Sequence, residues 1–340
     1  MAVAIALVGA GMPAVGSQGV GTPGASPASS PVATPPVEDV TCGVPDRLAA
    51  ADAAGDRTAV VEGTPDAGTP SASPVPVASP LPALETSPAD AADIERTIRA
   101  LALCRGEGQS DDVVELTTPA YRGLITGAGT PLDEEEYRDL AELQPTVPIE
   151  IRTVTDVRID EPGRASAEVV AVIANQLVRN RVSLLLVAPG EDEPLTDGGR
   201  AEPDARWVVD DEQPLEVDPP ADAEAVEVTL EEYAITVDPD GVDGVDVVLE
   251  IENVGARAHE VLVLRLDDGA TTGALITQPG PNLPEGISFV GQVSVGAGDE
   301  ATLVLVELPP GDYALVDLFP SEQGPPNLTL GMEATLTVQD

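Results

Sequence analysis

The spacing of apolar residues changes once along the chain, and this change constrains the fold more than any other feature of the sequence. Between residues 89 and 143 the apolar side chains recur at helical spacing, as in Ile94, Ile98 and Leu101. From residue 149 onward they alternate with polar residues in short runs, which is typical of half-buried strands. The chain therefore predicts an α+β part followed by an all-β part.

Three helices and a long antiparallel sheet are expected in the first part, over residues 88–218. Gly106 and Gly108 end the first helix, and Pro119 ends the second. The expected helices are 89–105, 110–118 and 131–143; the expected strands are 149–159, 165–177, 178–187 and a short one from Trp207. An acidic hairpin loop, 189–205, precedes the last strand.

The second part, over residues 223–340, is expected to be a Greek-key β-sandwich. Its strands are short and are separated by Gly and Pro turns, as at Pro309-Pro310-Gly311. A proline-stiffened joint, 218–222, connects it to the first part. We expect the two parts to fold separately, with no sheet that contains strands from both.

Charge excludes several classes of partner. The chain has 60 Asp and Glu against 16 basic residues, which gives a net charge of −44. Binding to nucleic acid or to anionic lipid needs clustered basic residues, so neither is expected. No apolar run reaches the roughly 20 residues of a membrane span. The acidity itself is interpreted as a solubility device, with adaptation to salt as the alternative.

The N-terminus indicates export. Residues 1–16 are apolar and small, as in a signal peptide, although the positive first segment is missing; a disordered apolar tail is the alternative. Residues 17–87 are rich in Pro, Ala and Ser, and are expected to form a disordered linker around a short segment with Cys42. The protein is therefore expected to be secreted or at the cell surface.

Cys42 and Cys104 are the two cysteines of the chain. In an exported protein such a pair favours a disulfide, which would tie the Cys42 segment to the first helix. The alternative is a buried, free Cys104 with an unpaired Cys42.

The segment LALCRGEGQSDDVVEL, with the closing segment ARWVVDDEQPL, resembles the nuclear transport factor 2-like (SnoaL-like) superfamily. The resemblance implies three helices on a curved antiparallel sheet, in the shape of a cone. Its members are pocket enzymes, with a His or Asp base, or non-catalytic modules. Residues 1–258 contain no His, so only Asp or Glu could be the base, with Tyr121 or Tyr137 as donor. We expect no enzymatic activity here.

The segments IENVGARAHEVLVLRL and GDYALVDLFPSEQGPPNLTLGMEATLTV resemble cupredoxins, the blue-copper domains. The resemblance places the family's metal ligands on four positions: the first His on His259, the Cys on Asp317, the second His on Asn327 and the axial Met on Met332. A blue-copper centre needs two His and one Cys thiolate with a weak axial Met. This chain keeps His259 and Met332 and lacks the other two ligands.

The resemblance therefore implies a degenerate metal site made of His259, Asp317 and Met332, with no cofactor expected. The alternative is a loose site for Cu(II) or Zn(II), in which Asp317 supplies a hard oxygen. The leading hypothesis is an exported, non-catalytic binding or scaffold protein with an unidentified protein or small-molecule ligand. A copper-binding or electron-transfer protein and an enzyme acting in the SnoaL-like pocket are the alternatives.

Overall fold

A computed structural model describes residues 40–45, 86–191, 193–195, 204–278, 280 and 282–339. The predicted signal peptide, 1–16, lies outside these residues. The same holds for the predicted linker, 17–87, except for its Cys42 segment and its last two residues.

Four helices open the described first part, where the sequence predicts three. They are α1 (Pro88–Glu107), α2 (Ser110–Leu116), α3 (Pro119–Ile125) and α4 (Glu134–Ala141). The helix that the prediction missed is α3. The Thr118 hydroxyl accepts the Tyr121 N–H and Pro119 occupies the first turn, so the proline begins a helix here as well as ending the previous one.

Antiparallel strands β1 (Ile149–Glu161), β2 (Arg164–Ile173), β3 (Gln176–Val187) and β4 (Arg206–Leu215) follow, in spatial order β1-β2-β3-β4. The turn between β2 and β3 falls at Ala174 and Asn175, where Ala174 has a positive φ of 54°. The predicted break between residues 177 and 178 was therefore wrong. An apolar residue occupies the turn, so the hydrophobic pattern does not mark it.

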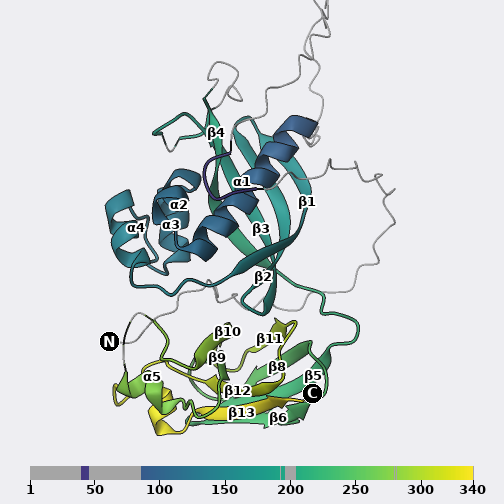
Figure 1. Cartoon of the computed structure of the whole chain (residues 1–340), viewed down its shortest axis with the longest axis vertical. Coiled ribbons are helices and arrows are strands. Elements are labelled where there is room, and N and C mark those ends of the chain that lie inside the picture. Colours follow the sequence, from purple (N-terminus) through teal and green to yellow (C-terminus); the bar gives the residue numbers. More distant parts are fainter. Residues whose placement is uncertain are drawn as a thin grey trace, which may run out of the picture.

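The helices cover one face of this sheet, with α1 lying across β1 and β4 (Figure 1). The core between them contains the apolar stripe of α1 and residues from the sheet, including Leu184, Trp207 and Val209. Trp207, at the start of β4, is buried in this core.

The second part is a β-sandwich, as predicted. One sheet contains β5 (Glu224–Glu231), β6 (Ala234–Asp238), β8 (Val247–Asn253) and β11 (Glu300–Leu305). The other sheet contains β7 (Gly241–Val242), β9 (His259–Leu266), β10 (Ile287–Val295), β12 (Gly311–Val316) and β13 (Glu333–Val338). Its strands lie in the order β10-β9-β12-β13-β7. Helix α5 (Gly273–Thr277) and the 3₁₀ helix η1 (Asn327–Leu330) lie in the connections. The core between the sheets is built mostly from Val and Leu.

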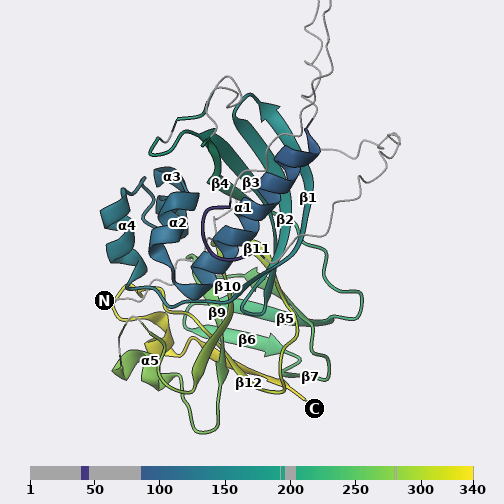
Figure 2. The ribbon, with the colours of Figure 1, turned by 45° about the horizontal axis from the view of Figure 1, so that its top comes forward.

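One sheet contains strands from both parts, so the prediction that no sheet would be shared was wrong. The end of β3 pairs with β11 at a single register position, Gln176 with Leu305. Around it, the Asn175 N–H donates to the Val290 carbonyl and the Asn175 carbonyl accepts the Val306 N–H. The turn between β2 and β3 is thereby hydrogen-bonded to the sandwich (Figure 2).

Apolar side chains reinforce this join. Val172 of β2 lies in one buried cluster with Val304 and Val306 of the β11 region, and Leu177 packs against it. The Asn175 amide also donates to the Val306 and Glu307 carbonyls. The predicted joint still falls between β4 and β5, in a stretch without helix or strand, but the two parts contact each other well beyond it.

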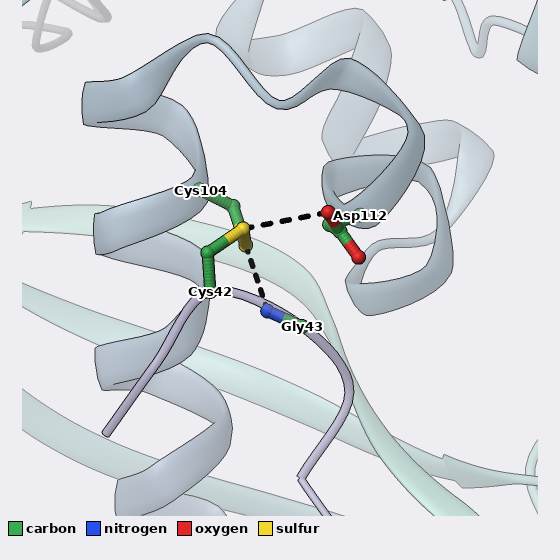
Figure 3. The surroundings of a disulfide bond; sticks show 4 residues. All are labelled: Cys42, Gly43, Cys104 and Asp112. Carbon is green, nitrogen blue, oxygen red and sulfur yellow. Dashed lines mark hydrogen bonds between the residues drawn. A yellow bond between two sulfur atoms is a disulfide. The ribbon is translucent and has the colours of Figure 1, made fainter. Parts of the chain in front are cut away.

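The disulfide between Cys42 and Cys104 is present, with Cα atoms 4.9 Å apart, and confirms the predicted pairing (Figure 3). It holds residues 40–45 against α1, where Val40 and Cys42 pack against the first core. The Gly43 N–H donates to Cys104 Sγ at 3.3 Å. Among the helices of the described residues, none has the length and apolarity needed to cross a membrane.

Candidate functional site

The four residues that the cupredoxin resemblance singles out come together at one end of the sandwich. His259 begins β9, Asp317 follows β12, Asn327 begins η1 and Met332 precedes β13. Their side chains are all buried, with exposed fractions of 4% or less. We call these four residues the His259 cluster.

Asp317 is the hub of the cluster. Its Oδ2 lies 2.6 Å from His259 Nδ1 and accepts a hydrogen bond from the Asn327 amide at 3.0 Å, while its Oδ1 accepts the Phe319 N–H at 2.7 Å. Both carboxylate oxygens are therefore occupied. These hydrogen bonds offset the cost of burying a polar side chain.

Backbone hydrogen bonds tie the fourth member to the hub. The Asp317 N–H donates to the Met332 carbonyl at 3.3 Å, and the Met332 N–H donates to the Asn327 carbonyl at 3.2 Å. The loop before His259 is fixed by Asn253, whose amide donates to three carbonyls. The cluster is thus held on every side by strand ends and by buried hydrogen bonds.

A second carboxylate lies beside the cluster. Burial raises the pKa of Glu260 to about 7, with a further contribution from the negative charge of Asp317. The Leu318 N–H donates to Glu260 Oε1 at 3.0 Å and opposes this shift. One face of the cluster therefore carries a carboxyl group that is near its titration midpoint at neutral pH.

These residues do not fit a blue-copper ion. The position of the thiolate is occupied by the Asp317 carboxylate. This carboxylate is hydrogen-bonded to the His259 imidazole, so the two strongest potential ligands are paired with each other. An ion bound through Nδ1 would have to break this hydrogen bond. The remaining imidazole nitrogen, His259 Nε2, is buried and has no hydrogen-bond partner among the described residues.

A second polar group lies in the first part, half-buried except for the buried Tyr121, and Tyr121 is the member that the sequence interpretation named. Arg105 of α1 donates to the Tyr121 hydroxyl at 3.2 Å, and that hydroxyl donates to Glu212 Oε2 at 2.6 Å. Glu212 Oε1 accepts a short hydrogen bond from the Asn180 amide. We call these four residues the Arg105 network.

The network joins the Arg105 guanidinium to the Glu212 carboxylate through the phenol of Tyr121. Burial, together with the nearby Glu212 carboxylate, raises the pKa of Tyr121 well above its ordinary value, so the phenol stays protonated. Burial alone would lower the pKa of Arg105, but Tyr121 and Glu212 raise it. The guanidinium therefore stays charged.

Tyr121 was named from the sequence as a candidate donor and lies in this network, whereas Tyr137 does not join it through a hydrogen bond in the described structure. Arg105 and Glu212 were missed. A signal for Arg105 existed, because it continues the apolar stripe of α1 at the same helical spacing: Ile94, Ile98, Leu101, Arg105. A charged residue in register with a buried stripe marks a buried charge.

Cys42, Cys104 and Asp112 form the group of potential metal ligands found among the described residues. The two sulfur atoms are bonded to each other, and Asp112 Oδ2 lies 3.5 Å from Cys42 Sγ (Figure 3). A disulfide sulfur is not a thiolate, so this group offers a metal only one strong ligand.

Comparison with known proteins gives matches to solved structures at low identity and low TM-score. No family model matches, and no curated protein matches. The solved structures that are similar include the reduced auracyanin of Roseiflexus castenholzii (17% identical, covering 35% of this chain and 98% of that chain, TM-score 0.26). Auracyanin A of Chloroflexus aurantiacus, a "blue" copper protein, is 18% identical over 34% of this chain and 98% of its own, with a TM-score of 0.25.

The nitrite reductase NirK of Thermus scotoductus is also similar, at 13% identity over 40% of this chain and 37% of its own, with a TM-score of 0.23. Similarity at this level says nothing about what this chain binds.

Proposed function

We propose that this chain is an exported, non-catalytic binding or scaffold protein, built from a SnoaL-like part and a cupredoxin-like sandwich that lacks a working blue-copper centre. The observation that supports the loss of copper is the 2.6 Å contact between His259 Nδ1 and Asp317 Oδ2. This contact holds the strand ends together without an ion.

Export is supported by the Cys42–Cys104 disulfide, because such bonds persist mainly in oxidising compartments. The SnoaL-like assignment of the first part is supported by helices on one face of a four-stranded antiparallel sheet. Both remain part of the proposal.

Each alternative has one observation in its favour. A copper-binding protein is favoured by His259 Nε2, which is buried without a hydrogen-bond partner in the described structure and is a chemically competent ligand atom. An enzyme acting in the first part is favoured by the Arg105 network, because it supplies the buried polar groups that such a pocket needs.

Copper titration of the whole protein tests the proposal. Wild-type protein and His259→Ala are loaded with Cu(II), desalted, and compared by visible absorption and by metal content. We expect no intense visible band and no stoichiometric copper retained in either protein. A band in the wild type, or stoichiometric copper that His259→Ala loses, would overturn the proposal in favour of the copper alternative.

A gain-of-function variant tests the cupredoxin-like assignment itself. Asp317→Cys combined with Asn327→His restores the His, Cys, His and Met donor set at the four aligned positions. If the cluster has the cupredoxin arrangement, this double variant should bind copper and acquire an intense visible band. The single variant Asn327→His is the matched control, and it should stay colourless because it lacks the thiolate.

A further inference from the structure

The first part contains a cavity of about 300 Å³, and the role proposed for the sandwich does not involve it. It lies between the C-terminal end of α1, the helices α2 and α4, and the adjoining ends of β1 and β2. This volume is at the lower end of the range for small-molecule sites, about 300–1,000 Å³. Apolar side chains line much of it, among them Val113, Ile125, Ala141, Ile149 and Ile173.

Arg105 brings a positive charge to the wall of this cavity. A guanidinium has five N–H donors, and in the described structure Arg105 makes one hydrogen bond, to the neutral phenol of Tyr121. It forms no salt bridge with any described residue, since Glu212 reaches it only through that phenol. Arg105 is half-buried, and a charge partly removed from water without a directly bonded counter-ion gains from pairing with an anion bound beside it.

Arg122, the residue that follows Tyr121, shows what a structural buried arginine does in the same part. Its Nε and Nη1 atoms donate to the carbonyls of Leu132, Val114 and Thr117. Those bonds tie α2, α3 and the loop before α4 together. Arg105, which makes a single hydrogen bond and borders a cavity, has donors left for a ligand.

Tyr137 of α4 lines the same cavity and is 5% exposed. Its hydroxyl makes no hydrogen bond to a described residue, and burial raises its pKa while the positive charge of Arg105 lowers it. The cavity thus has a second uncommitted donor. Glu142 is the carboxylate among the lining residues, and its side chain is exposed.

We propose that this cavity binds a small organic acid, with its carboxylate on Arg105 and Tyr137 and its apolar body against the apolar lining residues. The inference rests on the binding role proposed above and names the ligand class for it. The apolar lining favours an organic acid over an inorganic anion, which would lose its hydration without apolar contacts in return.

Calorimetric titration of the whole protein with benzoate, phenylacetate and hexanoate tests the inference. At least one acid should bind saturably, and its uncharged amide, benzamide for benzoate, should bind roughly 10- to 100-fold more weakly because it loses the charge-assisted hydrogen bonds. Arg105→Gln should weaken binding of the acid by a similar factor. Arg158→Gln, which removes the same charge from an exposed position on β1, should leave affinity unchanged.

Two further variants keep the test informative if Arg105→Gln does not fold, which thermal unfolding of each protein reports. Tyr137→Phe removes one hydroxyl and should weaken acid binding roughly 3- to 10-fold. Ala141→Phe fills part of the cavity while leaving Arg105 in place, and should abolish binding.

The inference is overturned by any of three results: no saturable binding of the three acids, equal affinity for benzoate and benzamide, or unchanged affinity in folded Arg105 and Tyr137 variants. These results are distinguishable from failure of the proposed loss of copper, because the copper titration reports on His259 and Asp317 in the other part.

Discussion

The two polar groups described above differ in how far their central charged side chain is hydrogen-bonded. In the His259 cluster the hub, Asp317, has both oxygens occupied by three donors. In the Arg105 network the terminal guanidinium makes one hydrogen bond and borders a cavity. A closed cluster contributes stability to its surroundings, whereas an open network leaves donors for a ligand.

The difference also runs against the expectation from family resemblance. The sandwich resembles proteins that hold a metal, yet the potential ligand atoms His259 Nδ1 and Asp317 Oδ2 are hydrogen-bonded to each other. The first part has a resemblance that specifies no ligand, yet it has a cavity with an uncommitted cation. Binding chemistry is therefore expected where donors are unused, irrespective of which part carries the more specific family pattern.

Removing the hub of the closed cluster should have the largest effect. Asp317→Ala leaves the His259 imidazole, the Asn327 amide and the Phe319 N–H without their partner in a buried site. We expect a loss of about 3–5 kcal/mol of unfolding free energy, measured by urea denaturation at pH 7. Asp312→Ala, an exposed position on β12, is the control, with a change below about 0.5 kcal/mol.

If the Asp317 and Asp312 variants were equally stable, the hydrogen bonds of Asp317 would not be what stabilises this end of the sandwich. Loss of stability confined to Asp317→Ala, with full recovery in Asp317→Asn, would instead show that the hydrogen-bond acceptor matters more than the negative charge.

Local patterns in the sequence predicted most of the elements, and they failed where structure depends on partners distant in the chain. In β10 a bulge between Phe289 and Gly291 breaks the alternation, so that Phe289 and Val290 are both buried and the sequence pattern does not mark this strand. The sheet shared by the two parts was missed for a similar reason. Nothing near Asn175 in the sequence indicates that its backbone pairs with Val290 and Val306.

The candidate sites show the same division. The resemblance placed His259, Asp317 and Asn327 together, and their side chains are hydrogen-bonded. It could not show that the imidazole bonds to the carboxylate, because that depends on side-chain distances. Arg105 could have been predicted from its register on α1. Its partner Glu212 lies on β4, more than 100 positions along the chain, so their proximity could be found only from the fold.

A smaller effect is expected from the carboxyl group beside the closed cluster. The pKa of Glu260 is about 7 in the folded protein, against an ordinary value of 4.5. Between these two values the folded state holds more proton at this site than the unfolded state, so the stability contributed here falls as pH rises and is constant above the folded pKa. Glu260→Gln removes this dependence and keeps an acceptor for the Leu318 N–H.

Relative to wild type, the unfolding free energy of Glu260→Gln should therefore increase by about 1–3 kcal/mol as the pH rises from 4.5 to 8. Urea denaturation of both proteins at a series of pH values measures it. Glu250→Gln, at an exposed position on β8, should show no such trend. A difference between Glu260→Gln and wild type that does not vary with pH would mean that the carboxyl group is hydrated.

The smallest stability effect should come from the open network, and it distinguishes the two groups most directly. Arg105→Gln removes a half-buried charge that lacks a directly bonded counter-ion, and the amide can still donate to the Tyr121 hydroxyl. The lost attraction to Glu212 and the relieved cost of burial oppose each other, so unfolding free energy should change by less than about 1 kcal/mol.

Arg122→Gln, which breaks hydrogen bonds to buried carbonyls, should instead cost about 2–4 kcal/mol. Urea denaturation of the two variants side by side measures this. If Arg105→Gln were as destabilising as Arg122→Gln, Arg105 would belong with the structural residues, and the cavity would lose its cation as a recognition element.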